Sequence, residues 1–255
     1  MAAALFQLEN AAAFGPNGHR IVGRIAERHL SAEAKSAVKA LIGPQSIAQV
    51  STWADEIKAD LRYRAAGPWH YVTIEDGETY ASSKKNPNGD AVAKLLEVID
   101  VLKQGVAPRQ QQQEALKWLV HLTGDVHQPL HVGRGDDRGG NSISVDWFGD
   151  SRNLHSVWDT GIVEAVKLSF SEYAEFIDQS VTVKVEAPGQ PDVMLWIRES
   201  QNLRDEVYEE PAPGIGGSYR YVYQKRPILE ARLKQAGLRL AQTLNYLFSD
   251  RRSRK

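Results

Sequence analysis

Residues 229 to 247 read LEARLKQAGLRLAQTLNYL, and this stretch decides the fold class. Its large apolar residues recur at steps of three and four positions, which places them on one face of an α-helix. Nothing polar lies on that face, so we expect it to pack against a buried core. Pro227 precedes the stretch and is expected to mark the entry to the helix. The apolar stripe consists of Leu229, Leu233, Ala236, Leu240, Leu244 and Leu247.

Three further segments carry helical signals. We expect a helix over 31 to 42, with Ser31 as the N-cap and Gly43 past its end. Two more are expected over 90 to 103 and 109 to 126. The chain therefore predicts an all-α fold.

Strand signals are scarce. Only 142 to 148 alternates between apolar and polar residues, and it follows a turn-rich segment, so we expect a short β-hairpin there. The segments 86 to 89 and 210 to 217 are rich in turn formers and are expected to be loops.

The composition indicates one domain with a local binding site. A chain of 255 residues with 42% hydrophobic residues can bury a single sizeable core. Lys and Arg total 31 against 32 Asp and Glu, so overall charge does not attract a polyanion, which would need a local site. With no Cys, disulfides and sulfur-ligated metals are excluded. No apolar run approaches the roughly 18 residues that span a bilayer, so we expect no membrane span.

The two ends differ from this domain, which we expect over 14 to 250. Residues 1 to 13 are expected to be a leader or the remnant of an export signal, because Ala11, Ala12 and Ala13 resemble a small-residue cleavage site before Phe14. A secreted or periplasmic location would follow. Residues 251 to 255 form a basic tail, for which a solvated surface segment is the simplest interpretation.

Two pairs of residues point to metal chemistry. The segment HLTGDVHQPLH, from His121 to His131, places His121 and Asp125 four apart on one helical face, and Pro129 lets the chain turn so that His131 can return towards them. His155 and Asp159, in NLHSVWD, form a second pair with the same spacing. One such pair is most often an ordinary surface hydrogen bond. Two pairs suit zinc, which takes imidazole nitrogen and carboxylate oxygen without needing a thiolate.

Three upstream segments offer further ligand types. Asp55 and His70 each lie close to a Trp, in STWAD and PWHY, and His19 closes GPNGH near the expected start of the domain. Each is weak evidence alone, because a buried polar residue is usually satisfied by hydrogen bonds.

Taken together, these motifs resemble the zinc-dependent single-strand-specific nucleases of the S-one/P-one type, whose fold is shared with bacterial zinc phospholipases C. The resemblance runs in order from Phe14 to Asp159, and the helical remainder fits the family's length. It implies three zinc ions bound by nine residues. The first ion would be bound by Asp55, His70, His121 and Asp125. The second would be bound by His131, His155 and Asp159. The third would be bound by His19, by Asp125 as a bridging carboxylate, and by the amino and carbonyl groups of Phe14.

Phe14 occupies the position where the family usually has an N-terminal Trp. Because its ligating atoms belong to the backbone, the different side chain should matter little. The amino group is available only if the chain is cleaved after Ala13, since a peptide nitrogen is not a neutral amine. An intact chain is therefore expected to have a weakened or empty third site.

The resemblance also implies a mechanism. A hydroxide held by the bridged pair of zincs would attack phosphorus, with Asp55 and Asp125 as the catalytic carboxylates, and the products would keep 5′ phosphates. The activity would be that of an endonuclease and 3′-nucleotidase on single-stranded RNA and DNA. We expect the protein to be a monomer.

Substrate contacts are implied at five positions. Tyr71 corresponds to an aromatic residue that stacks a base, which requires no particular sequence. The family often has an acidic or amide residue two positions on to bind the base, but here it is Thr73, so the base preference stays open. Lys58, Asn141 and Arg138 are expected to contact phosphate. For Lys58, an ordinary solvated lysine is the alternative interpretation.

Two other functions remain open at this point. A zinc phospholipase C or a general phosphomonoesterase could use the same metal cluster. Tyr71 and the presence of Asp159, where the phospholipases use Glu, favour the nuclease. A non-catalytic zinc protein would instead be expected to have closed four-ligand sites.

Overall fold

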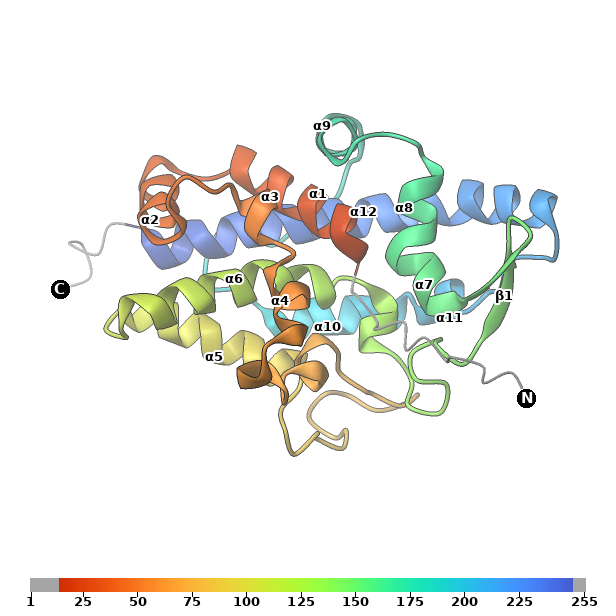
Figure 1. Cartoon of the computed structure of the whole chain (residues 1–255), viewed down its shortest axis with the longest axis horizontal. Coiled ribbons are helices and arrows are strands. Elements are labelled where there is room, and N and C mark those ends of the chain that lie inside the picture. The colour runs from red at the N-terminus through yellow and green to blue at the C-terminus, as the bar shows by residue number, and fades with distance from the viewer. Residues whose placement is uncertain (1–13, 250–255) are drawn as a thin grey trace.

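The computed structural model describes residues 14 to 249, so the expected leader at 1–13 and the basic tail at 251–255 lie outside the described residues. The fold is helical, as expected, and its longest element is α12 (Ile215–Phe248). Helix α1 (Gly15–Arg28) packs along α12, and α6 (Arg109–Asp125) contacts both (Figure 1). Every residue of the predicted stripe on α12 is buried, which confirms its role in the core.

The prediction that this helix begins after Pro227 was wrong, because α12 begins at Ile215 and Pro227 lies inside it. Proline normally interrupts a helix by removing an N–H and crowding the preceding turn. Here tertiary contacts hold the earlier turns. The hydroxyl of Tyr221 accepts a hydrogen bond from Trp158 Nε1 at 2.8 Å and donates to the carbonyl of Val207 at 3.1 Å. The expected loop at 210–217 is correspondingly shorter.

The other predicted helices are confirmed, with boundaries shifted by at most one residue. Helix α2 (Ala32–Ile42) is capped by the Ser31 side chain, which accepts a hydrogen bond from the Ala34 amide. Helix α5 (Ala91–Gln104) is capped in the same way by Asp90. It packs against α6.

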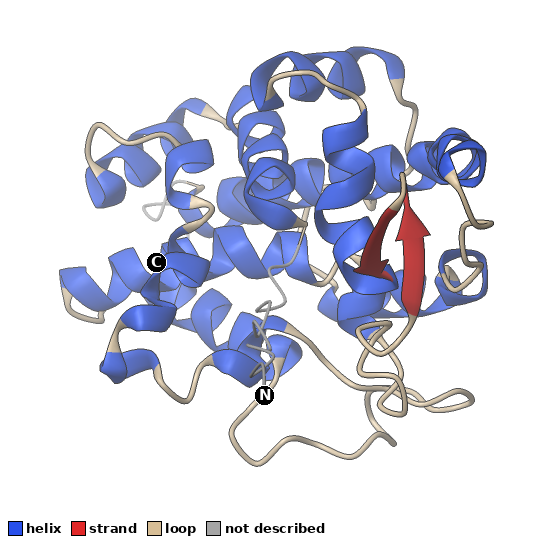
Figure 2. Ribbon diagram, turned by 45° about the vertical axis from the view of Figure 1, so that its right-hand side comes forward, coloured by secondary structure: helices blue, strands red, loops and turns tan. Residues whose placement is uncertain are grey.

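The single hairpin in the described part of the chain pairs β1 (Ser144–Trp147) with β2 (Asp150–Asn153) (Figure 2). The predicted segment 142–148 therefore covers only the first strand and the start of the turn. Phe148 and Gly149 form the turn with φ of 56° and 92°. Two positive φ values are typical of tight hairpin turns, and only Gly adopts them without cost. The second strand leads directly into the helical segment that contains His155.

Short helical elements connect the long helices and carry much of the site. Within residues 14 to 249, every helix is too short or too polar to cross a membrane. The remaining elements are α3 (Ile47–Val50), α4 (Trp53–Glu56), η1 (Ile57–Ala59), η2 (Leu61–Tyr63), η3 (Gly67–His70), η4 (Pro129–Val132), α7 (Leu154–Ser156), η5 (Val157–Gly161), α8 (Ile162–Ala165), α9 (Phe170–Ser180), α10 (Val193–Asn202) and α11 (Arg204–Val207).

Candidate metal centre

The structure brings the predicted His and Asp side chains together from six separate segments of the chain. It places them in three groups, within each of which the possible ligand atoms lie within 4.8 Å of one another. Asp55 is partly buried, and the others are buried. The groups are His19, His121 and Asp125; Asp55, His70 and His121; and His131, His155 and Asp159.

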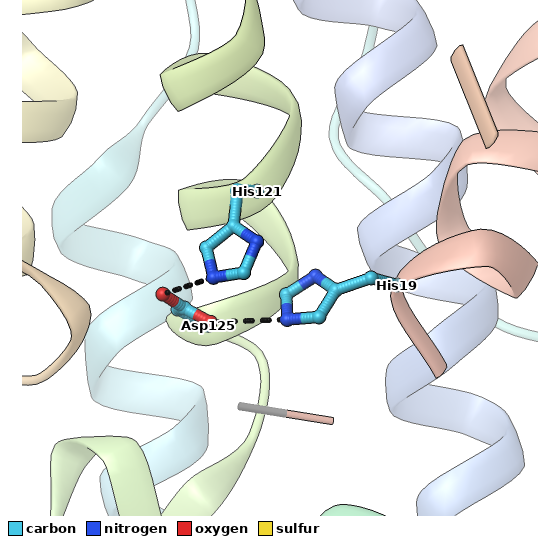
Figure 3. A group of neighbouring side chains, drawn as sticks. All are labelled: His19, His121 and Asp125. Carbon is cyan, nitrogen blue, oxygen red and sulfur yellow. Dashed lines mark ion pairs between the residues drawn. The ribbon is translucent and has the colours of Figure 1, made fainter. Parts of the chain in front are cut away.

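Asp125, in the last turn of α6, lies between the first two groups. Its Oδ1 is 3.4 Å from Nε2 of His19, which belongs to α1. Its Oδ2 is 3.4 Å from Nε2 of His121, one helical turn earlier on α6 (Figure 3). Oδ2 is also 3.2 Å from Nδ1 of His70, so Oδ1 faces His19 of the first group and Oδ2 faces His70 of the second, which is the arrangement that a bridging carboxylate requires.

His70, at the end of η3, completes the second group. Its Nδ1 is 3.2 Å from Asp125 Oδ2 and 3.1 Å from His121 Nε2. Oδ1 of Asp55, from α4, is 3.9 Å from His70 Nδ1 and 3.8 Å from His121 Nε2. Four side chains from α4, η3 and α6 thus direct ligand atoms to one point.

The third group lies on η4 and on the helical segment formed by α7 and η5. His155 Nε2 is 3.2 Å from Asp159 Oδ2, and His131 Nε2 is 3.6 Å from Asp159 Oδ1. The Nε2 atoms of His131 and His155 are 3.2 Å apart. The i, i+4 spacing and the turn at Pro129 produce the convergence that the sequence predicted.

Backbone carbonyls fix the orientation of three of these imidazoles. Nδ1 of His121 lies 2.7 Å from the carbonyl of Ser51, and Nδ1 of His131 lies 2.6 Å from that of His70. Nδ1 of His155 lies 2.6 Å from the carbonyl of Gly139. A carbonyl can only accept, so each Nδ1 donates and each Nε2 of a neutral ring has a lone pair. When both rings are neutral, two such lone pairs face each other between His131 and His155, and a proton or a metal ion between them relieves the repulsion.

Several buried atoms of the cluster have no hydrogen-bond partner among the described residues. They are both ring nitrogens of His19, Oδ2 of Asp55 and Oδ1 of Asp125. Leaving a buried polar atom unpaired costs about 1 to 3 kcal/mol, so native proteins rarely do so without a reason. Cations bound at these groups would engage one ring nitrogen of His19 and the carboxylate oxygens of Asp55 and Asp125.

The separations also fit a metal ion. Ligands at about 2.0 to 2.2 Å around a tetrahedral zinc are roughly 3.3 to 3.6 Å from one another. The distances above, from 3.1 to 3.9 Å, cover this range. The residues present therefore fit metal ions bound by nitrogen and oxygen.

Burial and mutual charge control the ionisation of the cluster. Burial lowers the pKa of His19 and of His70, which keeps both imidazoles neutral. Burial alone would raise the pKa of Asp125, but the neighbouring histidines, His121 foremost, hold it well below its usual value. Asp159 has a pKa of about 2 because His155 and His131 likewise outweigh its burial. Burial lowers the pKa of His131, but the hydrogen bond and charge of Asp159 prevail and raise it to about 9.

Phe14 is fully buried at the start of α1. Its carbonyl accepts the Gly18 amide at 3.0 Å, as a helix-initiating residue does. A carbonyl has two lone pairs, so this bond leaves one available for another partner. The predicted role of Phe14 as a ligand stays a proposal.

A cleft of about 750 Å³ opens beside the cluster and includes His70, His131 and His155 in its wall. All of the residues predicted to contact substrate line it, and Tyr71 is 42% exposed. Lys58 also forms an ion pair with Asp55, at 2.6 Å from Oδ1. The predicted contacts that share this cleft are Lys58, Tyr71, Thr73, Arg138 and Asn141.

Sequence reasoning missed two residues of the site. Gln128 is fully buried and donates from Nε2 to Asp159 Oδ1 at 2.7 Å, and no pattern singles out this Gln beside Pro129. Arg64 lines the cleft on the segment between η2 and η3. Its only sequence signal is a position between Asp55 and His70.

Two histidines, His29 and His127, lie outside the three groups. His127 is buried, and its Nε2 lies 2.9 Å from Arg239 of α12, where burial and the charges of Arg232 and Arg239 hold its pKa well below the usual value. It therefore accepts a hydrogen bond as a neutral ring. His29 pairs with Asp178, at 2.9 Å.

Comparisons with known proteins give a consistent result. The family model described as S1/P1 Nuclease matches residues 14 to 249. Endonuclease 4 of Arabidopsis thaliana is 33% identical over 97% of this chain and 93% of its own length. Endonuclease 2 of the same plant is 31% identical over 96% and 93%. Nuclease S1 of Aspergillus oryzae is 25% identical, with 92% of each chain covered.

Fold and site define a helical protein with a buried His/Asp centre for metal ions beside an open cleft. The chain belongs to the S1/P1 nuclease family. It is a phosphodiesterase, and the prediction of a single-strand-specific endonuclease is confirmed.

Proposed function

We propose that this endonuclease holds three zinc ions and also acts as a 3′-nucleotidase. The observation that carries the proposal is the position of Asp125, whose two oxygens face different ligand groups while Oδ1 has no hydrogen-bond partner among the described residues. A buried carboxylate with that geometry suits a pair of cations that it bridges.

The distances support one set of residues for each ion. Asp125 Oδ1 and His19 would hold one ion, together with the amino and carbonyl groups of Phe14 once the chain is cleaved after Ala13. The group of His131, His155 and Asp159 would hold another. The remaining ion would be held by Asp55, His70, His121 and Asp125.

The chemistry of the donors favours zinc. Imidazole nitrogen suits zinc and other late transition metals, whereas Mg²⁺ and Ca²⁺ prefer oxygen. The group of His131, His155 and Asp159 offers three protein ligands, and a site with three leaves room for water or substrate. This count supports a catalytic centre rather than a closed structural site.

The bound ions would supply an activated water and neutralise the charge that develops on phosphate. The protein's own contribution is to fix the ligands before substrate arrives. Asp125 fixes the positions of two ligand groups relative to each other. Asp55, whose Oδ2 has no hydrogen-bond partner among the described residues, is placed to orient the attacking water. Fixed charges of this kind lower the barrier because they need no rearrangement during the reaction.

The cleft supports a strand of nucleic acid as substrate. Tyr71 offers an exposed aromatic face for a base, and stacking requires no particular sequence. Thr73 lies in the same wall, and its hydroxyl both donates and accepts, so it suits more than one base. Arg138 and Asn141 also line the cleft, and Asn141 Nδ2 donates to the Arg138 carbonyl at 2.9 Å.

Lys58 has a different setting from the one its sequence suggested. Its ammonium lies against Asp55, where it counts among the charges that lower the pKa of that carboxylate. Phosphate entering the cleft would bring a second anion within reach of the same lysine. We assign Lys58 to both partners, with the contact to phosphate made when substrate binds.

These contacts favour single-stranded RNA and DNA and 3′-nucleotides as substrates, with 5′ phosphates on the products of strand cleavage. The described residues offer no feature that specifically favours a zinc phospholipase C or a general phosphomonoesterase. The cationic residues of the cleft, Lys58, Arg64, Arg134 and Arg138, suit a polyanionic strand better than a single headgroup.

We also propose that the chain is exported, processed after Ala13 and active as a monomer. The processing has chemical support, since the nitrogen of Phe14 can join His19 and Asp125 as a ligand only when it is a free amine. N-terminal sequencing of the exported protein tests the processing, and a chain that keeps Ala13 would contradict it.

The proposed activities are tested with protein that begins at Phe14. Single-stranded RNA, single-stranded DNA, a 3′-mononucleotide and phosphatidylcholine are incubated with it, with and without chelator and added zinc. Release of 5′-mononucleotides from both strands and of phosphate from the 3′-mononucleotide, dependent on zinc, is the expected result. Zinc-dependent lipid cleavage without nucleotide release would contradict the proposal.

A further inference from the structure

A second groove adjoins the cleft and is not accounted for by the proposed chemistry. Its volume is about 410 Å³, within the range of about 300 to 1,000 Å³ typical of small-molecule sites. The cleft and the groove share Pro68, Tyr71, Val72 and Thr73 in their walls. One short segment after η3 therefore separates them, and Tyr71 borders both.

The far wall of the groove comes from the loop before α5. Lys84, Asn86 and Pro87 line it, and Pro87 is exposed. The loop is fixed at its base, because the Asn86 side chain accepts the Asn88 amide at 2.9 Å and Trp69 Nε1 donates to the Asn88 carbonyl at 2.7 Å. The groove is thus a formed feature between two anchored segments.

Tyr71 lines both cavities, and its backbone is fixed on two sides. Its carbonyl accepts the Ala91 amide at 3.0 Å, which ties this residue to the start of α5. The neighbouring Val72 donates to the His131 carbonyl at 2.8 Å, which ties the segment to the metal ligands. The side chain remains 42% exposed. An aromatic ring has two faces, and each can stack a base.

The charges of the groove decide what it can bind. Lys84 and Lys85 line the groove together with three carboxylates, those of Glu75, Glu78 and Asp90. Each carboxylate accepts a backbone N–H: Glu75 from Gly135, Glu78 from Glu75 and Asp90 from Ala93. With more acidic than basic groups, the groove is not suited to phosphate. Its flat apolar surfaces, at Tyr71, Pro68 and Pro87, suit a neutral planar ring.

We propose that the groove binds a nucleobase adjacent to the one in the cleft, so that Tyr71 inserts between two successive bases of the same strand. The proposal rests on the proposed stacking of a base on Tyr71 within the cleft and extends it to the second face of the ring. Insertion separates bases that stack on each other in a duplex, so it contributes to the preference for single strands. The phosphate between the two bases passes the edge of the ring, outside the groove.

The test is a scan of base-free positions in a single-stranded DNA octamer, with kcat/KM measured for cleavage at the central linkage. Two adjacent base-free positions are each expected to lower kcat/KM by about tenfold, in line with the energy of one stacked base. Tyr71→Leu should remove both effects. Pro87→Ala should remove only the effect of the base-free position whose base would occupy the groove. Pro44→Ala, at an exposed proline after α2, should keep both effects.

The second subsite would be overturned if only one base-free position lowered kcat/KM, or if two positions still did so in Pro87→Ala. Either result would leave the proposed stacking in the cleft intact. No sensitive position at all would overturn both uses of Tyr71. Cleavage of the intact octamer reports the endonuclease activity separately in every case.

Discussion

The side chain of Gln128 donates a hydrogen bond to Oδ1 of Asp159 at 2.7 Å, and both residues are buried. Oε1 of the same amide accepts the Leu130 amide at 2.6 Å, so the side chain cannot turn away. Gln128 therefore fixes the carboxylate that faces His131 and His155. Residues that orient metal ligands in this way typically contribute 10- to 100-fold to metal affinity.

Gln128→Leu should weaken zinc binding in the group of His131, His155 and Asp159 by roughly 10- to 100-fold, because Asp159 loses its orienting donor. Zinc per chain, measured by elemental analysis over a series of free zinc concentrations, reports the loss without relying on activity. Gln179→Leu, on the exposed part of α9, is the matched control. An unchanged zinc titration would show that Gln128 only fills space.

Asp125→Asn should remove two ions rather than one, because each oxygen of this carboxylate faces a different group. A neutral amide can neither bridge two cations nor offset their charge. We expect one zinc to remain per chain and nuclease activity to fall by at least about 100-fold. His155→Ala is the comparison, since it should affect only the group on η4 and η5. Loss of a single ion in Asp125→Asn would contradict a bridging role.

Chelation should lower the melting temperature by roughly 10 °C. Ligand at about 1,000 times its Kd adds about 4 kcal/mol, and 1 kcal/mol moves a chain of this size by about 2 to 4 °C. The buried atoms of His19, Asp55 and Asp125 that have no hydrogen-bond partner among the described residues make the metal-free state costly. Differential scanning calorimetry with chelator, then with zinc restored, measures the shift. An identical melt in both states would contradict the account.

The ion pairs of Glu199 should make part of the stability dependent on pH. Burial would raise the pKa of Glu199, but hydrogen bonds from Arg239 and Arg232 outweigh it and lower the pKa. A depressed pKa in the folded state stabilises the protein above the unfolded value and ceases to do so as the pH falls through the folded one. Glu199→Gln should therefore lose about 2 kcal/mol at pH 7 and progressively less below about pH 4.5.

Urea unfolding of both forms between pH 3 and pH 7 measures this difference. Glu175→Gln, at an exposed position of α9, is the control and should show little change. A difference between wild type and Glu199→Gln that stays constant down to pH 3 would mean that the carboxylate charge is not what stabilises α12.

Local periodicity predicted α2, α5, α6 and the later part of α12, and the two His/Asp pairs, because these depend on neighbours three or four residues apart; it did not predict α1, α9 or α10. The meeting of α1, α4, η3 and α6 at one point depends on contacts between distant segments, and only the resemblance to a known family anticipated it. Gln128 left no signal because its partner, Asp159, is distant in sequence. The start of α12 was missed because Tyr221 is held by Trp158 and Val207, and such contacts outweigh the local effect of Pro227.

The sequence was also limited in what it could predict about substrate contacts. All five predicted residues line the cleft, which is as much as residue spacing and resemblance could establish. The ion pair between Lys58 and Asp55 was not foreseen, although the two lie three residues apart, because the sequence does not show which side of a short helical turn faces the cleft.

Three zinc ions at the His/Asp groups are proposed to support the cleavage of single strands. The most direct measurement is stepwise addition of zinc to metal-free protein that begins at Phe14, with zinc per chain and single-strand hydrolysis followed together. Activity is expected to appear only as the bridged sites fill and to be complete at three zinc ions per chain. Full activity in excess chelator, or at a single zinc ion per chain, would contradict it.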